Sequence, residues 1–343
     1  KRAGVSISTV SSVINNNKPV SRELRKKVEK AIDDLHYRPH LIARGLKSRK
    51  TSIIGVVLNN ATSPFFGPVL QGIEEVAYRE GYSLMLCDSR NDPKREESYI
   101  QLLEYNWVEA IILDTIANPK KNESYFDYLE KRIIQHRNIP LLSIVQDFSI
   151  VSSKYSVIIN NKEGGYIATK HLIDLGHDRI VHIIGNEDYM VSWERLEGYK
   201  QALEEHNINI NDSLMLQGNF SAISGYNEIK KILLKDRSFT AIFASNDQMA
   251  IGAIKALKEE GIRVPDDIAI IGFDNIYISS IIDPSLSTIN VPKYQIGSTA
   301  MEIISSRLKN SSHENVYKTL PINLIIRRST SLSGNYEWDL FGI

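Results

Sequence analysis

Short hydroxyl side chains line one side of a predicted helix near the N-terminus. Gly4 permits a tight turn and Ser6 is a good N-cap, so the sequence predicts a helix that begins at Ile7. One face of this helix is an apolar stripe of Val10, Val13 and Ile14. The other face carries Ser8, Thr9, Ser11 and Ser12. A helix with one packed face and one short, uncharged, hydrogen-bonding face suits the major groove of DNA, although a capped surface helix shows the same pattern.

Charge is divided unevenly along the chain. The 343 residues carry 41 basic and 41 acidic side chains, yet residues 1–50 carry thirteen Lys and Arg against four Asp and Glu. The first fifty residues are therefore a basic head with a net charge of +9, and the rest is a body with a net charge of −9. Because duplex DNA is a dense line of negative charge, a basic module gains affinity for it by releasing counterions.

A second helix and a basic segment complete the head. Ser21 is placed to cap a charged helix from Arg22 to about Leu35. The predicted core stripe of this helix consists of Leu24, Val28, Ala31, Ile32 and Leu35. In the segment that follows, Leu46 is an isolated apolar residue among basic ones, namely Arg44, Lys47, Arg49 and Lys50.

The order of these motifs resembles the LacI/GalR (lactose-repressor/galactose-repressor) family of transcription regulators. The matching patterns are A-G-V-S-x-x-T-V-S-x-V-x-N from Ala3, V-S from Val20 and Y-x-P-x-x-x-A-R-x-L from Tyr37. The resemblance implies that the helix from Ile7 is the recognition helix of a helix-turn-helix, preceded by the end of another helix at Lys1–Ala3. Because the sequence opens without Met, we expect the natural N-terminus to lie upstream.

The resemblance implies DNA contacts in two places. The base-facing candidates are Ile7, Ser8, Thr9 and Ser12. The segment Pro39–Lys47 would form a hinge helix in the minor groove, where Arg44 and Lys47 contact the DNA and Leu46 wedges between base pairs. Ser12 stands where the family usually has Arg, which reads guanine with two hydrogen bonds, so the operator sequence at that position stays open.

From Thr51 onward, short apolar runs alternate with helical patterns. Strands are predicted at 53–58, 83–87, 110–113, 180–184, 241–244 and 268–273. Helices are predicted at 65–78, 95–105, 164–175, 195–206, 225–234 and 247–260. This alternation predicts an α/β body with parallel sheets, and its two successive series predict two doubly wound lobes.

The body resembles the periplasmic-binding-protein-like fold that the same family uses. The matching motifs are Ser63-Pro64-Phe65-Phe66, Gln71-Gly72-Ile73-Glu74, Leu175-Gly176-His177, Arg195-Leu196-Glu197-Gly198-Tyr199, Asn246-Asp247, Gly272-Phe273-Asp274 and Arg327-Arg328-Ser329-Thr330. The resemblance implies three crossings between the lobes, near Asn160, Asn290 and Leu320. We therefore expect a DNA-binding head and hinge at 1–50, an N-terminal lobe at 51–160 and 291–320, and a C-terminal lobe at 161–290 and 321–343.

In such a fold a ligand binds between the lobes, at the carboxyl ends of the strands. Position in the chain implies an effector site of Phe65, Phe66, Asp114, Trp193, Arg195, Phe220, Asn246 and Asp274. Aromatic rings could stack on an apolar ligand face, and strand-end carboxylates and amides could meet hydroxyl groups. Arg195 is expected at a helix start, where a positive charge is unfavourable and so indicates a role in ligand binding.

Structural alternatives remain for several of these positions, and the ligand is open in part. Phe66 also fits the core, Asp114 a loop cap, and Trp193 and Tyr189 an exposed loop. The mixture of aromatic and forked polar groups predicts a sugar or sugar derivative as the effector. Val291 stands where the family often has Gln, which leaves effectors other than the common hexoses open.

Three other functions fit parts of the sequence. An enzyme is disfavoured because no nucleotide-binding, nucleophile-elbow or zinc-protease motif occurs and the eight His are scattered. An exported sugar-binding protein shares the body but not the basic head. A catabolite-control-type regulator would use a phosphorylated carrier protein as corepressor. The segment Lys293–Lys309 resembles its docking helix at Ile296-Gly297 and Ala300-Met301, although Glu302 would repel a phosphoryl group.

The apolar and charged fractions are those of a soluble globular protein. The single cysteine, Cys87, lies in an apolar run and is predicted to be buried. We predict no cofactor and no metal, and the longest apolar runs are too short to cross a membrane. The expected protein is a cytoplasmic homodimer that binds palindromic operator DNA and responds to a sugar-like effector.

Overall fold

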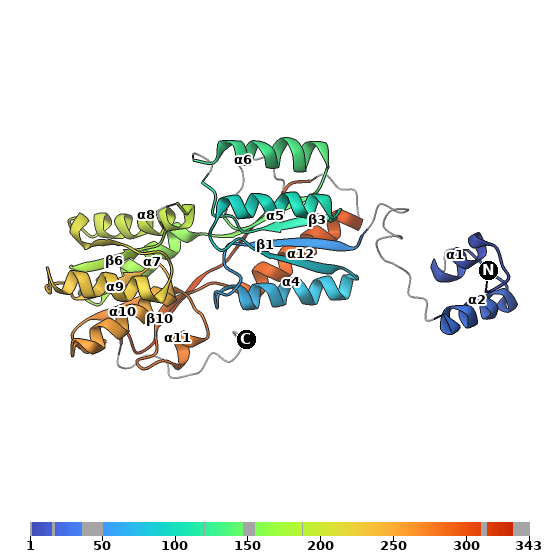
Figure 1. Ribbon diagram of the computed structural model, residues 1–343. Helices are drawn as coiled ribbons and strands as arrows, with labels where there is room; N and C mark the ends of the chain where they lie inside the picture. Colours follow the sequence, from blue (N-terminus) through green and yellow to red (C-terminus); the bar gives the residue numbers. More distant parts are fainter. Residues whose placement is uncertain are drawn as a thin grey trace. The chain divides into compact units, whose positions relative to one another are not determined.

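The computed structural model describes residues 2–15, 18–35, 51–118, 121–146, 155–186, 188–309 and 314–331. It divides into two compact units, Lys1–Ser52 and Ile53–Ile343, shown in Figure 1. The predicted hinge residues Arg44, Leu46 and Lys47 lie outside the described residues.

The first unit contains two short helices, α1 (Ile7–Asn15) and α2 (Arg22–Asp34), as the sequence predicts. The Ser6 hydroxyl accepts a hydrogen bond from the Thr9 backbone N–H at 3.1 Å and caps α1. Ser21 caps α2 in the same way through the Leu24 N–H at 3.4 Å. A small core of Val13, Val28 and Ala31 joins the two helices. The prediction that Leu24 and Leu35 belong to this core is wrong, because both side chains are exposed.

The N-terminal lobe of the second unit is built on a six-stranded parallel sheet with the order β11-β5-β4-β3-β1-β2. Its strands are β1 (Ile53–Leu58), β2 (Ser83–Asp88), β3 (Ala110–Leu113), β4 (Leu141–Val145), β5 (Tyr155–Ile159) and β11 (Val316–Leu320). Its helices are α4 (Phe66–Glu80), α5 (Pro93–Tyr105), α6 (Glu123–Tyr128), the π-helix η1 (Leu129–His136) and α12 (Lys293–Lys309).

The C-terminal lobe repeats this plan with the order β12-β10-β9-β8-β6-β7. Its strands are β6 (Ile180–Ile184), β7 (Met215–Gln217), β8 (Ala241–Ala244), β9 (Ala269–Asp274), β10 (Ser287–Asn290) and β12 (Asn323–Ile325), of which β12 is antiparallel to β10. Its helices are α7 (Asn161–Asp174), α8 (Met190–Glu205), the 3-10 helix η2 (Asp212–Leu214), α9 (Ala222–Leu233), α10 (Asp247–Glu259) and α11 (Ile278–Ile281).

Helices cover both faces of each sheet because the strands are apolar on both sides. In β1, Ile54, Val56 and Leu58 pack toward α4 and α12, whereas Val57 packs with α5 and η1 residues. Strands buried on both faces read as continuous apolar runs, which is the pattern that the sequence shows. The prediction of an α/β body with two doubly wound sheets is confirmed.

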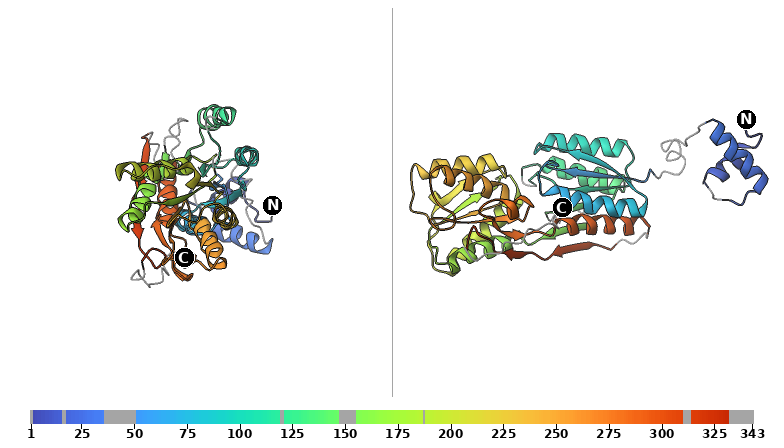
Figure 2. Two further views of the ribbon diagram at one scale, coloured as in Figure 1. Left: turned by 90° about the vertical axis from the view of Figure 1, so that its left-hand side faces the viewer. Right: turned by 90° about the horizontal axis from the view of Figure 1, so that it is seen from below.

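Paired glycines bring neighbouring helices into close contact. A Cβ on Gly297 of α12 would lie 1.9 Å from the Val69 carbonyl oxygen of α4. A Cβ on Gly165 of α7 would likewise lie 2.2 Å from the Arg195 carbonyl oxygen of α8. Figures 1 and 2 show α4 and α12 side by side along the N-terminal lobe. The close packing of α7 on α8 also fixes the position of the Arg195 backbone, which Gly165 contacts.

The chain passes between the two sheets three times. It leaves the first sheet after β5 and enters α7, returns after β10 into α12, and crosses again between β11 and β12. The carboxyl ends of β1, β3 and β4 therefore face those of β6, β8 and β9. This arrangement places strand-end side chains from both lobes around one space.

Candidate functional site

A cavity of about 240 Å³ lies between the two lobes of the body. Its lining comes from strand ends, from the loops that follow them and from the first turns of helices. The lining residues are Asn59, Asn60, Ser63, Phe65, Phe66, Asn91, Asp114, Val145, Gln146, Tyr189, Val191, Arg195, Asn219, Phe220, Ser221, Asn246, Gln248 and Asp274. A cavity of this size fits a compact small molecule, since sites for drug-sized ligands enclose about 300–1,000 Å³.

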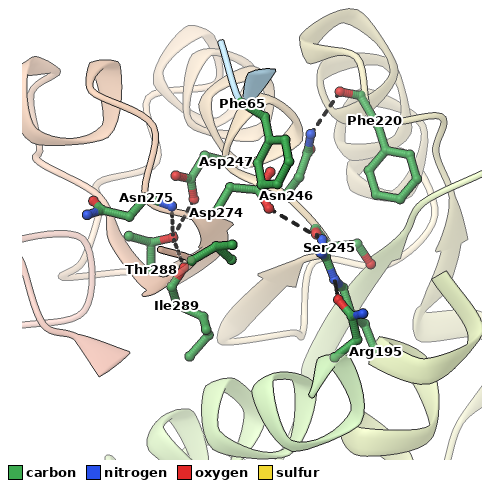
Figure 3. A network of polar contacts seen from close by, with 12 residues as sticks. Phe65, Arg195, Phe220, Ser245, Asn246, Asp247, Asp274, Asn275, Thr288 and Ile289 are labelled. Carbon is green, nitrogen blue, oxygen red and sulfur yellow. Dashed lines mark hydrogen bonds and ion pairs between the residues drawn. The ribbon is translucent and has the colours of Figure 1, made fainter. Parts of the chain in front are cut away.

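Arg195 on the C-terminal lobe is buried and held on several sides (Figure 3). Its Nε–H donates to Asn161 Oδ1 at 3.0 Å, and its Nη1–H donates to the Ser245 carbonyl oxygen at 2.5 Å. The same Nη1 lies 3.7 Å from Asp274 Oδ1, and the guanidinium carbon lies 3.6 Å from the centre of the Phe273 ring. These contacts fix the guanidinium at the cavity wall and partly neutralise its charge.

The expectation that Arg195 starts a helix is wrong. Helix α8 begins at Met190, so Arg195 lies in its second turn. The unfavourable helix-dipole argument therefore does not apply there. What places Arg195 is the glycine-mediated contact of α8 with α7, whose first residue is Asn161.

Asp274 is the last residue of β9 and lies next to Arg195 in the cavity wall. Burial raises the pKa of its carboxyl group, and the Arg195 guanidinium opposes this shift. The Lys293 ammonium donates to the backbone carbonyls of Asp274 and Asn275, at 2.6 and 2.7 Å, and so anchors the end of the strand. The predicted placement of Asp274 at a strand end that faces the cavity agrees with the structure.

Asn246 lines the cavity, but both polar atoms of its side chain form hydrogen bonds with backbone groups of the same lobe. Its Oδ1 accepts from the Met249 N–H at 3.0 Å as the N-cap of α10, and its Nδ2 donates to the Phe220 carbonyl oxygen at 3.0 Å (Figure 3). The neighbouring Asp247 is buried and accepts hydrogen bonds from Thr288, Ser279 and the Ile276 backbone. Burial still raises the pKa of Asp247 to about 6.

Asp114 follows β3 and lines the cavity from the N-terminal lobe. It is 2% exposed, and its Oδ2 has no hydrogen-bond partner among the described residues. Burial raises its pKa well above the usual range, and the nearby Glu96 carboxyl raises it further, against a hydrogen bond from the Asn59 backbone. Glu96 is itself fully buried, and burial raises its pKa to about 7.

Aromatic rings close the cavity from both lobes. Phe65 and Phe66 are buried and meet edge to face, with ring centres 5.0 Å apart. Phe220 and Tyr189 form a similar pair at 5.6 Å. Because these four rings lie in the lining, a ligand in the cavity meets flat apolar surfaces beside its polar partners.

Trp193 is not brought to this cavity. It lies within α8 rather than on a loop, and half of its side chain is exposed. Tyr189, at the N-cap of the same helix, takes the position near the cavity mouth.

The cavity lining contains four residues with backbone φ in the left-handed region: Asn91, Val145, Phe220 and Asp274, at 59°, 70°, 67° and 108°. For a β-branched residue such as Val145 this conformation is strained. Strained backbone conformations concentrate at ligand sites, where the surrounding structure holds them.

Among the described residues, several polar contacts join the lobes around the cavity. The Tyr189 hydroxyl donates to Asn91 Oδ1, Gln248 Nε2 donates to Ser63 Oγ at 3.2 Å, and Lys121 pairs with Asp188 at 2.5 Å. These contacts tie the two lobes together in the described conformation.

On the head, the four DNA-binding candidates of α1 differ in exposure, since Thr9 and Ser12 are half-buried. Ile7 is 89% exposed, and Ser8 is also exposed. The Ser6 hydroxyl hydrogen-bonds with the hydroxyls of Ser8 and Thr9, at 2.7 and 2.8 Å, while Ser12 Oγ donates to the Ser8 carbonyl oxygen at 2.9 Å. The hydroxyl-bearing surface of α1 is therefore ordered before it meets a partner.

Comparison with known proteins agrees with both parts of the structure. Residues 1–40 match the model of the bacterial regulatory proteins of the lacI family, and residues 169–330 match the periplasmic binding protein-like domain. The HTH-type transcriptional repressor PurR of Vibrio atlanticus is 37% identical over 330 residues, which is 96% of each chain. This chain belongs to the lacI family. PurR of Photobacterium profundum is also 37% identical, over 333 residues and 96% of each chain.

Solved structures of lacI-family regulators share the fold. The lac repressor dimer bound to operator and an anti-inducer matches with a TM-score of 0.83 and 26% identity, and the match covers 96% of both chains. The complex of the transcriptional regulator CelR with cellobiose matches with a TM-score of 0.73 and 26% identity over 96% of this chain and 97% of that one. The chain is thus a DNA-binding transcription regulator and not an enzyme.

Within the described ranges, no group of three or more His, Cys, Asp or Glu side chains could hold a metal ion. The described helices include none that is long and apolar enough to cross a membrane.

Sequence interpretation missed much of the cavity's polar lining. Asn59, Asn60, Asn91, Gln146 and Gln248 reach it from loops or helix starts. Asn59 and Asn60 directly follow a predicted strand, so their position at a carboxyl end was available as a signal. Gln146 follows β4, a strand that the sequence did not predict, and donates to the Thr115 carbonyl oxygen of the same lobe. Asn91 and Gln248 depend on contacts between the lobes that no local pattern encodes.

Proposed function

We propose that this lacI-family chain is a repressor whose operator affinity is controlled by a small effector bound in the cavity between the lobes. The observation that carries the proposal is that one cavity combines buried polar groups of both lobes with flat aromatic rings. A ligand that contacts both walls favours one relative position of the lobes. Ligand binding and DNA binding are then coupled through the position of the lobes, and the coupling free energy in allosteric proteins is typically about 1–3 kcal/mol.

The ligand that suits this lining best is a sugar or a sugar derivative. Its C–H faces would pack on Phe65 and Phe220, and its hydroxyls would meet Asp114, Arg195 and Asp274. Two family structures add support, since one is a complex with cellobiose and another, 28% identical to this chain, holds bound ribose. A nucleobase is the alternative that the same flat rings would accept.

Operator recognition rests on the exposed face of α1. We place Ile7, Ser8, Thr9 and Ser12 against base edges, and Arg44, Leu46 and Lys47 in the hinge contact. Two heads of a homodimer would then bind a palindromic operator in the cytoplasm. The lac repressor dimer bound to operator supports this arrangement.

The carrier-protein alternative receives no support from α12. The four residues that resemble a docking helix, Ile296, Gly297, Ala300 and Met301, are buried, and Gly297 packs against α4. The residue at the position where a docking helix would carry a basic side chain is Glu302, which is exposed and pairs with Arg79 at 3.6 Å. The small-molecule effector is therefore the better proposal.

Selection of binding sites from a random DNA pool tests the DNA-binding assignment. The full-length protein should enrich a two-fold symmetric sequence, and its affinity should fall steeply with salt. Ile7→Ala should weaken binding by about 1–3 kcal/mol, because Ile7 is exposed for contact with a base edge. Leu35→Ala, which also truncates an exposed apolar residue of the head, is the matched control and should leave affinity unchanged. Equal effects of the two substitutions would remove α1 from the interface.

A further inference from the structure

A buried lysine at the second crossing between the lobes contacts the strand end that carries Asp274. Lys293 is the first residue of α12, a helix of the N-terminal lobe, and it is 5% exposed. Its Nζ donates to the carbonyl oxygens of Asp274 at 2.6 Å, Asn275 at 2.7 Å and Val291 at 3.3 Å. A lysine ammonium has three N–H donors, so one donor is available for each of these carbonyls. A side chain of the N-terminal lobe thereby holds main-chain atoms of the C-terminal lobe at the cavity wall.

The two residues that Lys293 contacts at the end of β9 have an unusual backbone, and we call them the β9 corner (Asp274 and Asn275). Asp274 has φ 108° and Asn275 has φ 52°, so both residues lie in the left-handed region. Such conformations cost free energy in residues other than glycine and persist only where the surrounding structure enforces them. The ammonium contributes to this enforcement, because both carbonyl oxygens of the β9 corner point at it.

Other polar contacts hold the β9 corner through Asn275. The Asn275 N–H donates to Thr288 Oγ1 at 3.3 Å (Figure 3), and Asn275 Oδ1 accepts from Arg327 Nη2 at 2.9 Å. Its Nδ2 donates to Asn290 Oδ1 at 3.1 Å. These three contacts come from the C-terminal lobe, whereas the Lys293 contact comes from the N-terminal lobe. Loss of the Lys293 ammonium would therefore leave the C-terminal lobe's own contacts with Asn275 in place.

We propose that Lys293 is a positioning residue for effector binding, which sets the place of the Asp274 carboxyl group from the opposite lobe. This inference rests on the proposed function, because it concerns an acid that we place against the effector. Asp274 Oδ1 lies 3.7 Å from Arg195 Nη1, so a shift of the β9 corner also changes the spacing of these two polar groups. Lys293 is not among the residues that line the cavity, so we assign it an action through Asp274.

A double-mutant cycle on the full-length protein tests whether Lys293 acts through Asp274. D-glucose, D-ribose and adenine are titrated calorimetrically, and the cycle is measured with a probe that binds. Lys293→Met keeps an unbranched side chain but removes the ammonium, and it should weaken that probe by about tenfold or more. In an Asp274→Ala background the same substitution should change the Kd by less than about threefold, because the group that it positions is gone. Equal fold-changes in the two backgrounds would overturn the proposal.

A matched control separates positioning from a general loss of stability. Leu257 is fully buried in the core of the C-terminal lobe and does not line the cavity. Leu257→Ala should lower the melting temperature at least as much as Lys293→Met does, because it leaves a cavity in the core. It should nevertheless leave the Kd of the probe within about twofold of wild type. A weakening as large as that of Lys293→Met would reduce the lysine to a structural group and overturn the proposal.

Amide hydrogen exchange without ligand, measured by NMR, keeps this inference separate from the proposed function. The Asn275 and Ile276 amides donate to Thr288 Oγ1 and Asp247 Oδ2. Lys293→Met should speed their exchange by about tenfold or more, because the β9 corner then opens more easily. Wild-type exchange rates at both amides would overturn the inference. Faster exchange together with no binding of any probe would support the role of Lys293 and count against the sugar or nucleobase effector.

Discussion

Two acids face the cavity from opposite lobes, and they differ in how the protein supports them. Asp274 is 7% exposed and Asp114 is 2% exposed, so both are removed from water. Asp274 lies 3.7 Å from a guanidinium that is itself fixed by Asn161 and Ser245, and Lys293 anchors the backbone beneath it. Asp114 has a second acid behind it and an oxygen without a partner among the described residues.

The difference shows how one cavity can separate stability from selectivity. A buried pair with its hydrogen bonds made is part of the scaffold, and removing one partner leaves the other as an isolated charge. A buried acid without a hydrogen-bond donor lowers stability, and it contributes to function only when a ligand supplies a hydrogen-bond partner. We therefore expect substitutions on the two walls to change stability in opposite directions.

The largest effect is expected from Arg195→Met. This change leaves Asp274 buried without its cation and also removes the donors to Asn161 and Ser245. The free energy of unfolding, measured by urea denaturation, should fall by about 3–5 kcal/mol. The double variant Arg195→Met, Asp274→Asn should recover part of this loss, because no carboxylate is left unpaired. A double variant with the simple sum of the two single losses would show that the pair is not coupled.

The next effect is the pH dependence that Glu96 confers. Burial raises its pKa from 4.5 to about 7, so the folded state binds a proton that the unfolded state releases above about pH 4.5. Stability is therefore lost as the pH rises from about 5 to 8, by about 3 kcal/mol for this group. Glu96→Gln should flatten the dependence of the unfolding free energy on pH.

A residual slope should persist in Glu96→Gln, because burial also raises the pKa values of Asp247 and Asp274. The matched comparison is Glu97→Gln, which removes a neighbouring carboxyl of α5 that is not buried. The same slope in wild type and Glu96→Gln would contradict the buried position of Glu96.

The smallest effect is expected from Lys121→Ala. Lys121 and Asp188 join the two lobes, but both side chains are more than half exposed. Exposed ion pairs contribute about 0–1 kcal/mol, and salt screens them. The unfolding free energy should change by a few tenths of a kcal/mol, and the effector Kd by less than about threefold. A large loss of effector affinity would show that this exposed ion pair contributes to ligand binding, which we expect only of the buried residues that line the cavity.

The core of each lobe could be predicted from the sequence because its strands are continuous apolar runs between helical patterns. The predicted bounds of β1, β3, β6 and β8 coincide with the structure. The strand β10 was missed because its four residues, Ser287–Asn290, are mostly polar, whereas the equally short β3 and β8 are wholly apolar. The strand β12 has only three residues, too few for periodicity to reveal. The π-helix η1 also carries no signal that distinguishes it from an α-helix.

The site was predictable where chemistry follows a strand directly, as at Asp114, Asn246 and Asp274. The contacts that hold the site residues in place could not be predicted. Arg195 depends on Asn161 and Ser245, which lie 34 and 50 positions away in the chain. Glu96 stands in the polar run Lys94–Glu97, which resembles an exposed helix face, and only the packing of Thr115 and Tyr125 around it shows that it is buried.

The most direct test of the account is the affinity of the full-length protein for its selected operator, measured by fluorescence anisotropy with and without the effector identified by titration. In wild type, saturating effector should change the operator Kd by about 5- to 150-fold, in either direction. In Asp114→Asn the same effector concentration should change it far less, while the Kd without effector stays close to wild type. An operator Kd that saturating effector leaves unchanged in wild type would contradict control of DNA binding through this cavity.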